Sequence, residues 1–238
     1  MLTKKIKLTP ELIKFYIRKD DENSRKILQE NSLEFSKIFY HQDEKGNTFL
    51  HYIAKKNVLH MAKFFIDFEQ NIMVHSYRAI RNKTWSRSVV KDENGEIELS
   101  RIILIENEDG HLPVHLAAGS FGKHNAETAE RSVLKFLIES DIQQKQDSDK
   151  VLRSLRKRDD FRANALQHAM LKHIHESKGD DTSTNKAVEC IIATIENSII
   201  DETLTEKDGY SALRHIILSK EVNGENSLQG ARDKRPVP

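Results

Sequence analysis

The sequence predicts a mainly α-helical protein built as an elongated stack of helix–turn–helix units. A turn-and-helix motif recurs four times between residues 43 and 218, and internal repetition of this kind is the signature of stacked repeat architectures. Within the copies, apolar residues recur three and four positions apart, which is the spacing of one helix face. The hydrophobic fraction is 37% and the charged fraction 32%, a balance that suits a thin stack with much surface per residue.

The two clearest copies lie in the first half of the chain. They are DEKGNTFLHYIAKKNVLHMAKFFID at residues 43–67 and NEDGHLPVHLAAGS at residues 107–120. Gly46 permits a tight turn, and Thr48 is suited to cap the helix that follows it. Pro113 is expected at a first helical position, where its missing N–H costs nothing. Each copy therefore predicts a turn that leads directly into a helix.

Two weaker copies follow, DDFRANALQHAM at residues 159–170 and EKDGYSALRHII at residues 206–217. The first two copies follow the pattern D-x-x-G-x-T-P-L-H-x-A-A, the last two keep only some of its positions, and in this the chain resembles the ankyrin-repeat family. The resemblance is strong in the first two copies and degenerate in the last two. It implies an ankyrin-repeat domain over residues 43–219, with His51 and His115 bonding loop backbone between repeats.

The architectural prediction is about four ankyrin units, with helix pairs near residues 48–66, 113–138, 165–196 and 211–219. Because each repeat contacts only its neighbours, the core is expected to form a ladder along the stack. Its predicted members are Leu50, Ala54, Phe64, Phe65, Val114, Ala117, Phe136, Leu137, Leu166, Ala169, Ile191 and Leu213.

The copies are spaced more widely than the ankyrin period of about 33 residues. Equivalent apolar positions at 50, 114, 166 and 213 are 64, 52 and 47 residues apart, so long insertions separate the repeats. The largest insertion is placed at residues 68–105, with a short helix over Gln70–Arg81. We then expect a β-hairpin in which Trp85–Lys91 pairs with Glu96–Ile103 around the Asn94-Gly95 turn signal.

The two ends of the chain lie outside the repeats. Residues 1–42 carry short helical patterns and are predicted to be an N-terminal helical cap. Residues 220–238 contain almost no apolar residues, and the fourth repeat has no credible second helix. Two interpretations stay open for this tail: it is disordered or irregular, or the sequence is truncated from a longer protein.

The composition argues against several classes of function. Lys plus Arg number 38 and Asp plus Glu 37, with no basic stripe to follow phosphates, so nucleic acid is not expected as a partner. The sequence contains no run of about 18 apolar residues, so no membrane span is predicted. The single cysteine, Cys190, lies on an apolar helix face and suits a reducing compartment, so a cytoplasmic location is expected.

No catalytic motif is found. G-x-S-x-G, P-loop and G-x-G-x-x-G patterns are missing, and His168, His173 and His175 lack the spacing of a helical metal pair. We therefore predict that the chain is not an enzyme and uses neither a cofactor nor a metal.

A partner-binding surface is implied by the resemblance. In ankyrin proteins the turn tips and the outward positions of each first helix line a concave face. Transferred residue by residue, these positions are Lys45, Asn47, Lys55, Lys56, Asp109, His111, Ser120, Phe161, Lys172 and Tyr210. The centre of the face is expected on the second and third copies. An alternative site is the insertion, through Trp85 and Arg87.

The leading functional hypothesis is a module that binds another protein. Its composition and its large insertions resemble the ankyrin effectors that intracellular bacterial pathogens place in the cytosol of eukaryotic host cells, which implies a host protein as partner. The alternative hypothesis is the targeting part of a larger effector enzyme, whose catalytic domain would follow Pro238.

Overall fold

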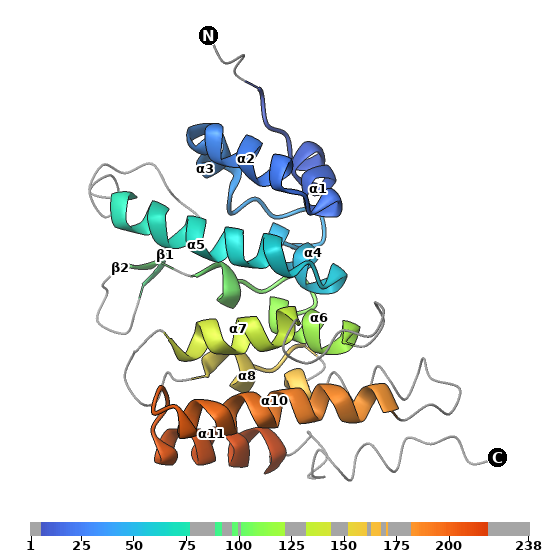
Figure 1. The fold of residues 1–238 in the computed structure, drawn as a ribbon, viewed down its shortest axis with the longest axis vertical. Helices are drawn as coiled ribbons and strands as arrows, with labels where there is room; N and C mark the ends of the chain where they lie inside the picture. The colour runs from blue at the N-terminus through green and yellow to red at the C-terminus, as the bar shows by residue number, and fades with distance from the viewer. Residues whose placement is uncertain are drawn as a thin grey trace, which may run out of the picture.

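A computed structural model of the chain describes residues 6–76, 89–91, 97–99, 101–121, 132–143, 152–160, 163–167, 170 and 182–218. Over these residues the protein is mainly helical, which confirms the predicted mainly-α class. The helices lie in successive layers along one long axis, from the N-terminal helices at one end to α10 and α11 at the other (Figure 1).

The N-terminal layer consists of α1 (Pro10–Lys19), α2 (Glu22–Glu30) and α3 (Ser32–Ile38). The first helix begins where Thr9 accepts a hydrogen bond from the backbone N–H of Leu12 at 3.3 Å, with Pro10 at the first helical position. These two residues leave few unsatisfied N–H groups at the helix start. The predicted cap region thus contains three helices, of which α1 packs against α4.

The following layers place short helices in one row and longer helices in a second row (Figure 1). The short row holds α4 (Phe49–Lys56) and α6 (Pro113–Ser120), and the long row holds α5 (Leu59–Ser76), α7 (Val133–Ile142) and α10 (Thr182–Ile200). Neighbours in a row pack against each other: α4 on α6, α5 on α7, and α7 on α10. The short helix α8 (Arg153–Arg156) lies beside α7, and α11 (Glu206–Leu218) forms the last layer and contacts both α8 and α10 (Figure 1).

The predicted core is confirmed within the described residues. Leu50, Ala54, Phe65, Val114, Ala117, Leu137, Leu166, Ile191 and Leu213 are buried, and Phe64 and Phe136 pack against them while partly exposed. Ala169 lies outside the described residues. The sequence did not predict the contribution of the N-terminal helices, whose Phe35 and Phe39 are fully buried against Phe65.

Two predicted element boundaries are wrong. The helix α5 continues without a break from Leu59 to Ser76, so no separate helix begins at Gln70, because no Gly or Pro interrupts the run. At the other end of the proposed insertion, Ile102–Leu104 form a short 3-10 helix, η2, with Ile102 and Ile103 buried. These residues belong to the core and not to a hairpin strand.

The predicted hairpin is described only in part. Strand β1 (Val89–Lys91) pairs antiparallel with β2 (Ile97–Leu99), with Val89 opposite Leu99 and Lys91 opposite Ile97. The remainder of the proposed hairpin, including Trp85, Arg87 and the Asn94-Gly95 turn, lies outside the described residues and stays a prediction.

The fourth copy of the motif also differs from expectation. The helix α11 already begins at Glu206, so Gly209 lies within the helix and not in a turn before it. The start is set by Thr205, whose hydroxyl accepts a hydrogen bond from the backbone N–H of Asp208 at 3.2 Å and lies 2.6 Å from its carboxylate. Because Thr205 caps the helix from upstream, the helix starts before Gly209 and not after it as expected.

A buried carboxylate holds the two ends of the insertion together. Glu69 of α5 is fully buried, and its Oε1 accepts hydrogen bonds from the backbone N–H of Ile102 at 2.6 Å and from the Tyr40 hydroxyl at 3.1 Å. The Nε of Arg101 lies 4.0 Å from Oε2. The pKa of Glu69 is raised above its usual value, because burial outweighs the opposing effects of the hydrogen bond from Ile102 and the charge of Arg101. Residues 77–100 are therefore inserted between two segments that this contact holds together, the end of α5 and the start of η2. We call the contact of Glu69 with Tyr40, Arg101 and Ile102 the Glu69 clasp.

Replacing residues 77–100 by a Gly/Ser linker of about six residues should leave a cooperatively folded protein, since loop length costs only about 0.6 kcal/mol per doubling. Adding Arg101→Ala to this variant should cost about 3 kcal/mol, because the buried carboxylate of Glu69 loses its cation. Urea unfolding followed by circular dichroism measures both. If the linker variant alone lost its cooperative transition, the insertion would be part of the core.

Candidate functional site

Three turns between the layers share one hydrogen-bond design. We call them the first turn (residues 43–48), the second turn (107–112) and the third turn (159–164, with 161–162 not described). In each, the side-chain oxygen of the opening Asp or Asn accepts a bond from the backbone N–H four residues later. The bonds are Asn47 to Asp43 at 2.9 Å, His111 to Asn107 at 2.9 Å and Ala163 to Asp159 at 2.8 Å. The opening side chain thus closes each turn locally.

Successive turns are joined by backbone hydrogen bonds. The N–H of Glu108 donates to the carbonyl of Lys45 at 3.0 Å, and the N–H of Asp160 donates to the carbonyl of Asp109 at 3.0 Å. Gly46 and Gly110 make this approach possible, with φ values of 72° and 71°. A Cβ on either glycine would lie 2.8 Å from the donor nitrogen of the next turn. Both positions therefore require glycine for conformation and for space.

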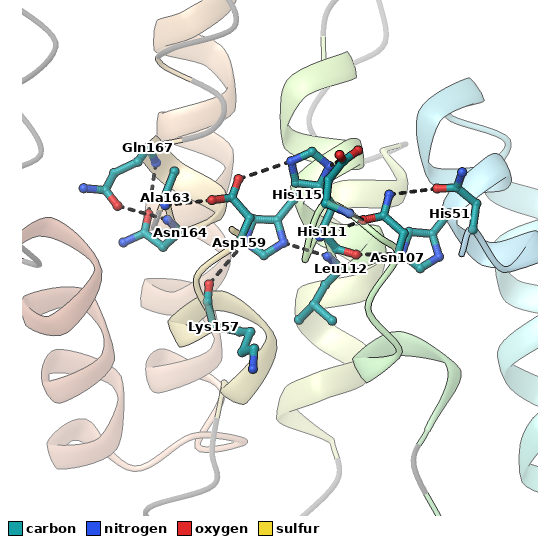
Figure 2. A network of polar contacts seen from close by, with 12 residues as sticks. His51, Asn107, His111, Leu112, His115, Lys157, Asp159, Ala163, Asn164 and Gln167 are labelled. Atoms are coloured by element: carbon teal, nitrogen blue, oxygen red, sulfur yellow. Dashed lines mark hydrogen bonds and ion pairs between the residues drawn. The ribbon is translucent and has the colours of Figure 1, made fainter. Parts of the chain in front are cut away.

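A polar side chain links each turn to its helix. His51 Nδ1 accepts a bond from the N–H of Thr48 at 3.1 Å, and its Nε2 lies 2.8 Å from the carbonyl of His111 in the second turn. His115 repeats the arrangement with the N–H of Leu112 at 2.9 Å and the carbonyl of Lys157 at 3.2 Å (Figure 2). Both histidines therefore have the structural role that the resemblance implied.

Glutamine replaces histidine in the third turn. Gln167 Oε1 accepts the N–H of Asn164 at 2.9 Å, and Asn164 Oδ1 accepts the N–H of Gln167 at 3.0 Å (Figure 2). An amide oxygen thus performs the acceptor role of the imidazole nitrogen at the start of the next helix. Sequence reasoning overlooked Gln167, although its separation along the sequence from Asp159, which opens the third turn, equals the separation of His51 from Asp43 in the first.

The His111 side chain joins the second and third turns. Its Nε2 lies 3.2 Å from Asp159 Oδ2, and its Nδ1 lies 3.8 Å from Asp109 Oδ2. The residue is only 9% exposed, so the expectation that it points outward toward a partner is not met. Asp159 opens a turn 48 residues further along the chain, and this contact brings His111 inward.

The other predicted surface residues divide into three groups. The first group is exposed and comprises Lys45, Lys55, Lys56, Asp109 and Tyr210, of which Tyr210 is 55% exposed. The inward group comprises Asn47, whose side-chain oxygen accepts a bond from Asn107 at 2.9 Å, and Ser120, which is buried. The last group, outside the described residues, comprises Phe161, Lys172, Trp85 and Arg87.

The described residues contain little that suggests chemistry. No group of three His, Cys, Asp or Glu side chains among them could hold a metal ion. Cys190 is buried, with Sγ 3.7 Å from Ser132 Oγ, and burial raises the pKa of its thiol. None of the described helices is both long enough and apolar enough to cross a bilayer.

Comparison with known proteins adds no further assignment. The chain matches no family model and no curated protein.

Replacing Gly46 or Gly110 by Ala should destabilise the protein by about 2 kcal/mol, because alanine is strained at positive φ and its Cβ overlaps the next turn. Glu202→Gly is a control of opposite sign, since Glu202 is exposed with a φ of 57° and glycine relieves its strain. Urea titration measures all three variants. Wild-type stability in Gly46→Ala would mean that the turns are not held this closely.

The pH dependence of stability should reveal His51. Burial lowers its pKa to about 4, whereas an unfolded histidine titrates near 6.5. Because the unfolded chain then binds the proton more readily, stability should fall by about 3 kcal/mol as the pH drops from about 6.5 to 4.

His51→Gln is the matched variant, since Gln167 performs the same acceptor role in the third turn. It should be folded at neutral pH and lose less stability than the wild type on acidification. The free energy of unfolding of both proteins is measured by urea titration at pH 7, 6, 5 and 4. If it fell equally with pH in the two proteins, the prediction for His51 would be wrong.

Proposed function

We propose that the chain is an ankyrin-repeat protein whose function is to bind another protein. The repeated turn design supports this proposal: an opening Asp or Asn, a glycine at positive φ in the first two turns, and a polar side chain that caps the following helix. The pairing of short helices α4 and α6 in one row, beside α5 and α7 in another, is the arrangement that such repeats would produce.

One observation carries the functional part of the proposal, namely the rigid alignment of the three turns. Their backbones are joined by hydrogen bonds of 3.0 Å, while charged side chains at the tips stay exposed: Lys45, Glu108, Asp109 and Asp160. A rigid row of exposed polar groups loses little conformational entropy on binding, which favours recognition of a preformed protein surface.

The partner class and the cellular location follow from the resemblance to bacterial effectors. On that basis we propose that the chain acts in the cytosol of a eukaryotic host cell and holds a host protein there. The proposed activity is binding, through the turn tips and the adjoining exposed residues of α4.

Affinity capture from a eukaryotic lysate, followed by titration of the purified captured protein, tests this proposal. A charge-reversed tip variant combines Lys45→Glu, Asp109→Lys and Asp160→Lys. We expect a 1:1 complex with the wild type and at least about tenfold weaker binding by the tip variant, because complementary charges contribute to affinity and association rate.

The control combines Lys26→Glu and Glu30→Lys, both exposed on α2 and away from the turns. This variant should bind like the wild type. The proposal fails if the folded chain forms no saturable complex, or if the tip variant and the control bind equally well.

A further inference from the structure

Two helices from different layers form a surface that combines cationic side chains with aromatic rings. Arg18 of α1 donates a hydrogen bond from Nε to the hydroxyl of Tyr52 on α4 at 2.8 Å, and its guanidinium carbon lies 5.7 Å from the centre of that ring. The Lys19 ammonium lies 5.2 Å from the centre of the Phe15 ring. Both contacts fall within the range of cation–π attraction.

Two more cations extend this surface along α4. Lys55 and Lys56 follow Tyr52 by three and four positions in the helix and are exposed. Side chains at these spacings share one helix face, so both lysines lie on the Tyr52 side. We define the α1–α4 surface by its six members: Phe15, Arg18, Lys19, Tyr52, Lys55 and Lys56.

None of the four cations of this surface has a carboxylate oxygen within 4.0 Å in the described part of the chain. Some other cations there do, among them Lys14 with Asp43, Arg25 with Glu22, Lys37 with Glu34, and Lys157 with Glu106. The α1–α4 surface therefore brings together four cations that make no ion pair within the described residues, on a chain of net charge +1.

The surface also offers apolar area. Phe15 is 46% exposed, although the other large apolar side chains of α1 are buried or half-buried. An exposed aromatic ring amid charged groups is typical of protein-binding hot spots. In contrast, α6 has no exposed residue along its length, so in the row of short helices the accessible face lies on α4.

We propose that the α1–α4 surface binds an acidic protein segment that also carries an aromatic or large apolar side chain. The acidic groups would pair with Arg18, Lys19, Lys55 and Lys56, and the apolar side chain would pack on Phe15. This inference rests on the proposed protein-binding function and names the chemistry of the partner.

The geometry favours a short acidic segment over a phosphate backbone or a membrane. Carboxylates stand at both ends of α1, with Glu11 exposed at its start and Asp20 just after its end. A long polyanion that continues past either end of the helix would meet like charge there, whereas a short acidic segment that stays between them would not. Tyr52 is held by Arg18, so its hydroxyl end is not free to enter a bilayer as interfacial aromatic residues do.

Fluorescence anisotropy with a labelled 12-residue probe tests the proposal. The probe carries four Asp or Glu residues around one central Trp and is otherwise Gly and Ser, and its control carries Lys in place of every acidic residue. We expect saturable binding of the acidic probe, weakened at least about fivefold between about 50 and 200 mM salt by charge screening. The lysine probe should not bind.

Two variants locate the binding site. The combination Phe15→Ala, Lys55→Glu and Lys56→Glu should weaken probe binding at least about tenfold, with an unfolding midpoint in urea close to that of the wild type, because all three side chains are exposed. The control combines Lys26→Glu and Lys207→Glu, which changes the net charge equally at exposed positions on α2 and α11. It should bind the probe like the wild type.

Three results would overturn the inference: no binding of the acidic probe, equal binding by the surface variant and the control, or tighter binding to single-stranded DNA or to phosphatidylserine vesicles. A captured partner that binds the wild type and the surface variant equally would reject this surface but preserve the proposed function. Failure to obtain any saturable protein complex would reject the proposed function itself.

Discussion

The close approach of backbone between successive turns is the constraint on which the rest of the structure depends. The Lys45 carbonyl meets the N–H of Glu108, and the Asp109 carbonyl meets that of Asp160, each at 3.0 Å. Only glycine at positions 46 and 110 leaves room for these bonds. Once the turns are fixed at this spacing, the helices that they start must also pack at a fixed spacing, and the apolar faces of α4 and α6 meet.

This arrangement buries polar groups, and hydrogen bonds between one layer and the next satisfy them. His51 accepts a bond from its own helix start and contacts the second turn, while His115 does the same toward Lys157. The Glu69 clasp applies the same logic between α5 and η2, where the carboxylate of Glu69 accepts a hydrogen bond from the N–H of Ile102. An unpaired buried polar group costs more than a formed bond contributes, so these contacts also specify which segments are neighbours.

The rigid interior has a consequence for binding. Side chains predicted to face a partner in the second turn and on α6, such as His111 and Ser120, are used within the stack and are buried. Four exposed cations that make no ion pair within the described residues lie instead where α4 meets α1: Arg18, Lys19, Lys55 and Lys56. We therefore place the proposed recognition surface toward the N-terminal end, with the turn tips continuing it along the stack.

The sequence by itself determined the helical class, the positions of the first three turns and most of the core, because glycine, capping residues and apolar spacing act locally. Tertiary structure decided the burial of His111, which depends on Asp159 from the next turn, and the assignment of Arg101 and Ile102 to the core, which depends on Glu69. It also brought Arg18 beside Tyr52, 34 residues later. These outcomes rest on contacts between segments far apart in the chain, and local periodicity carries no information about such partners.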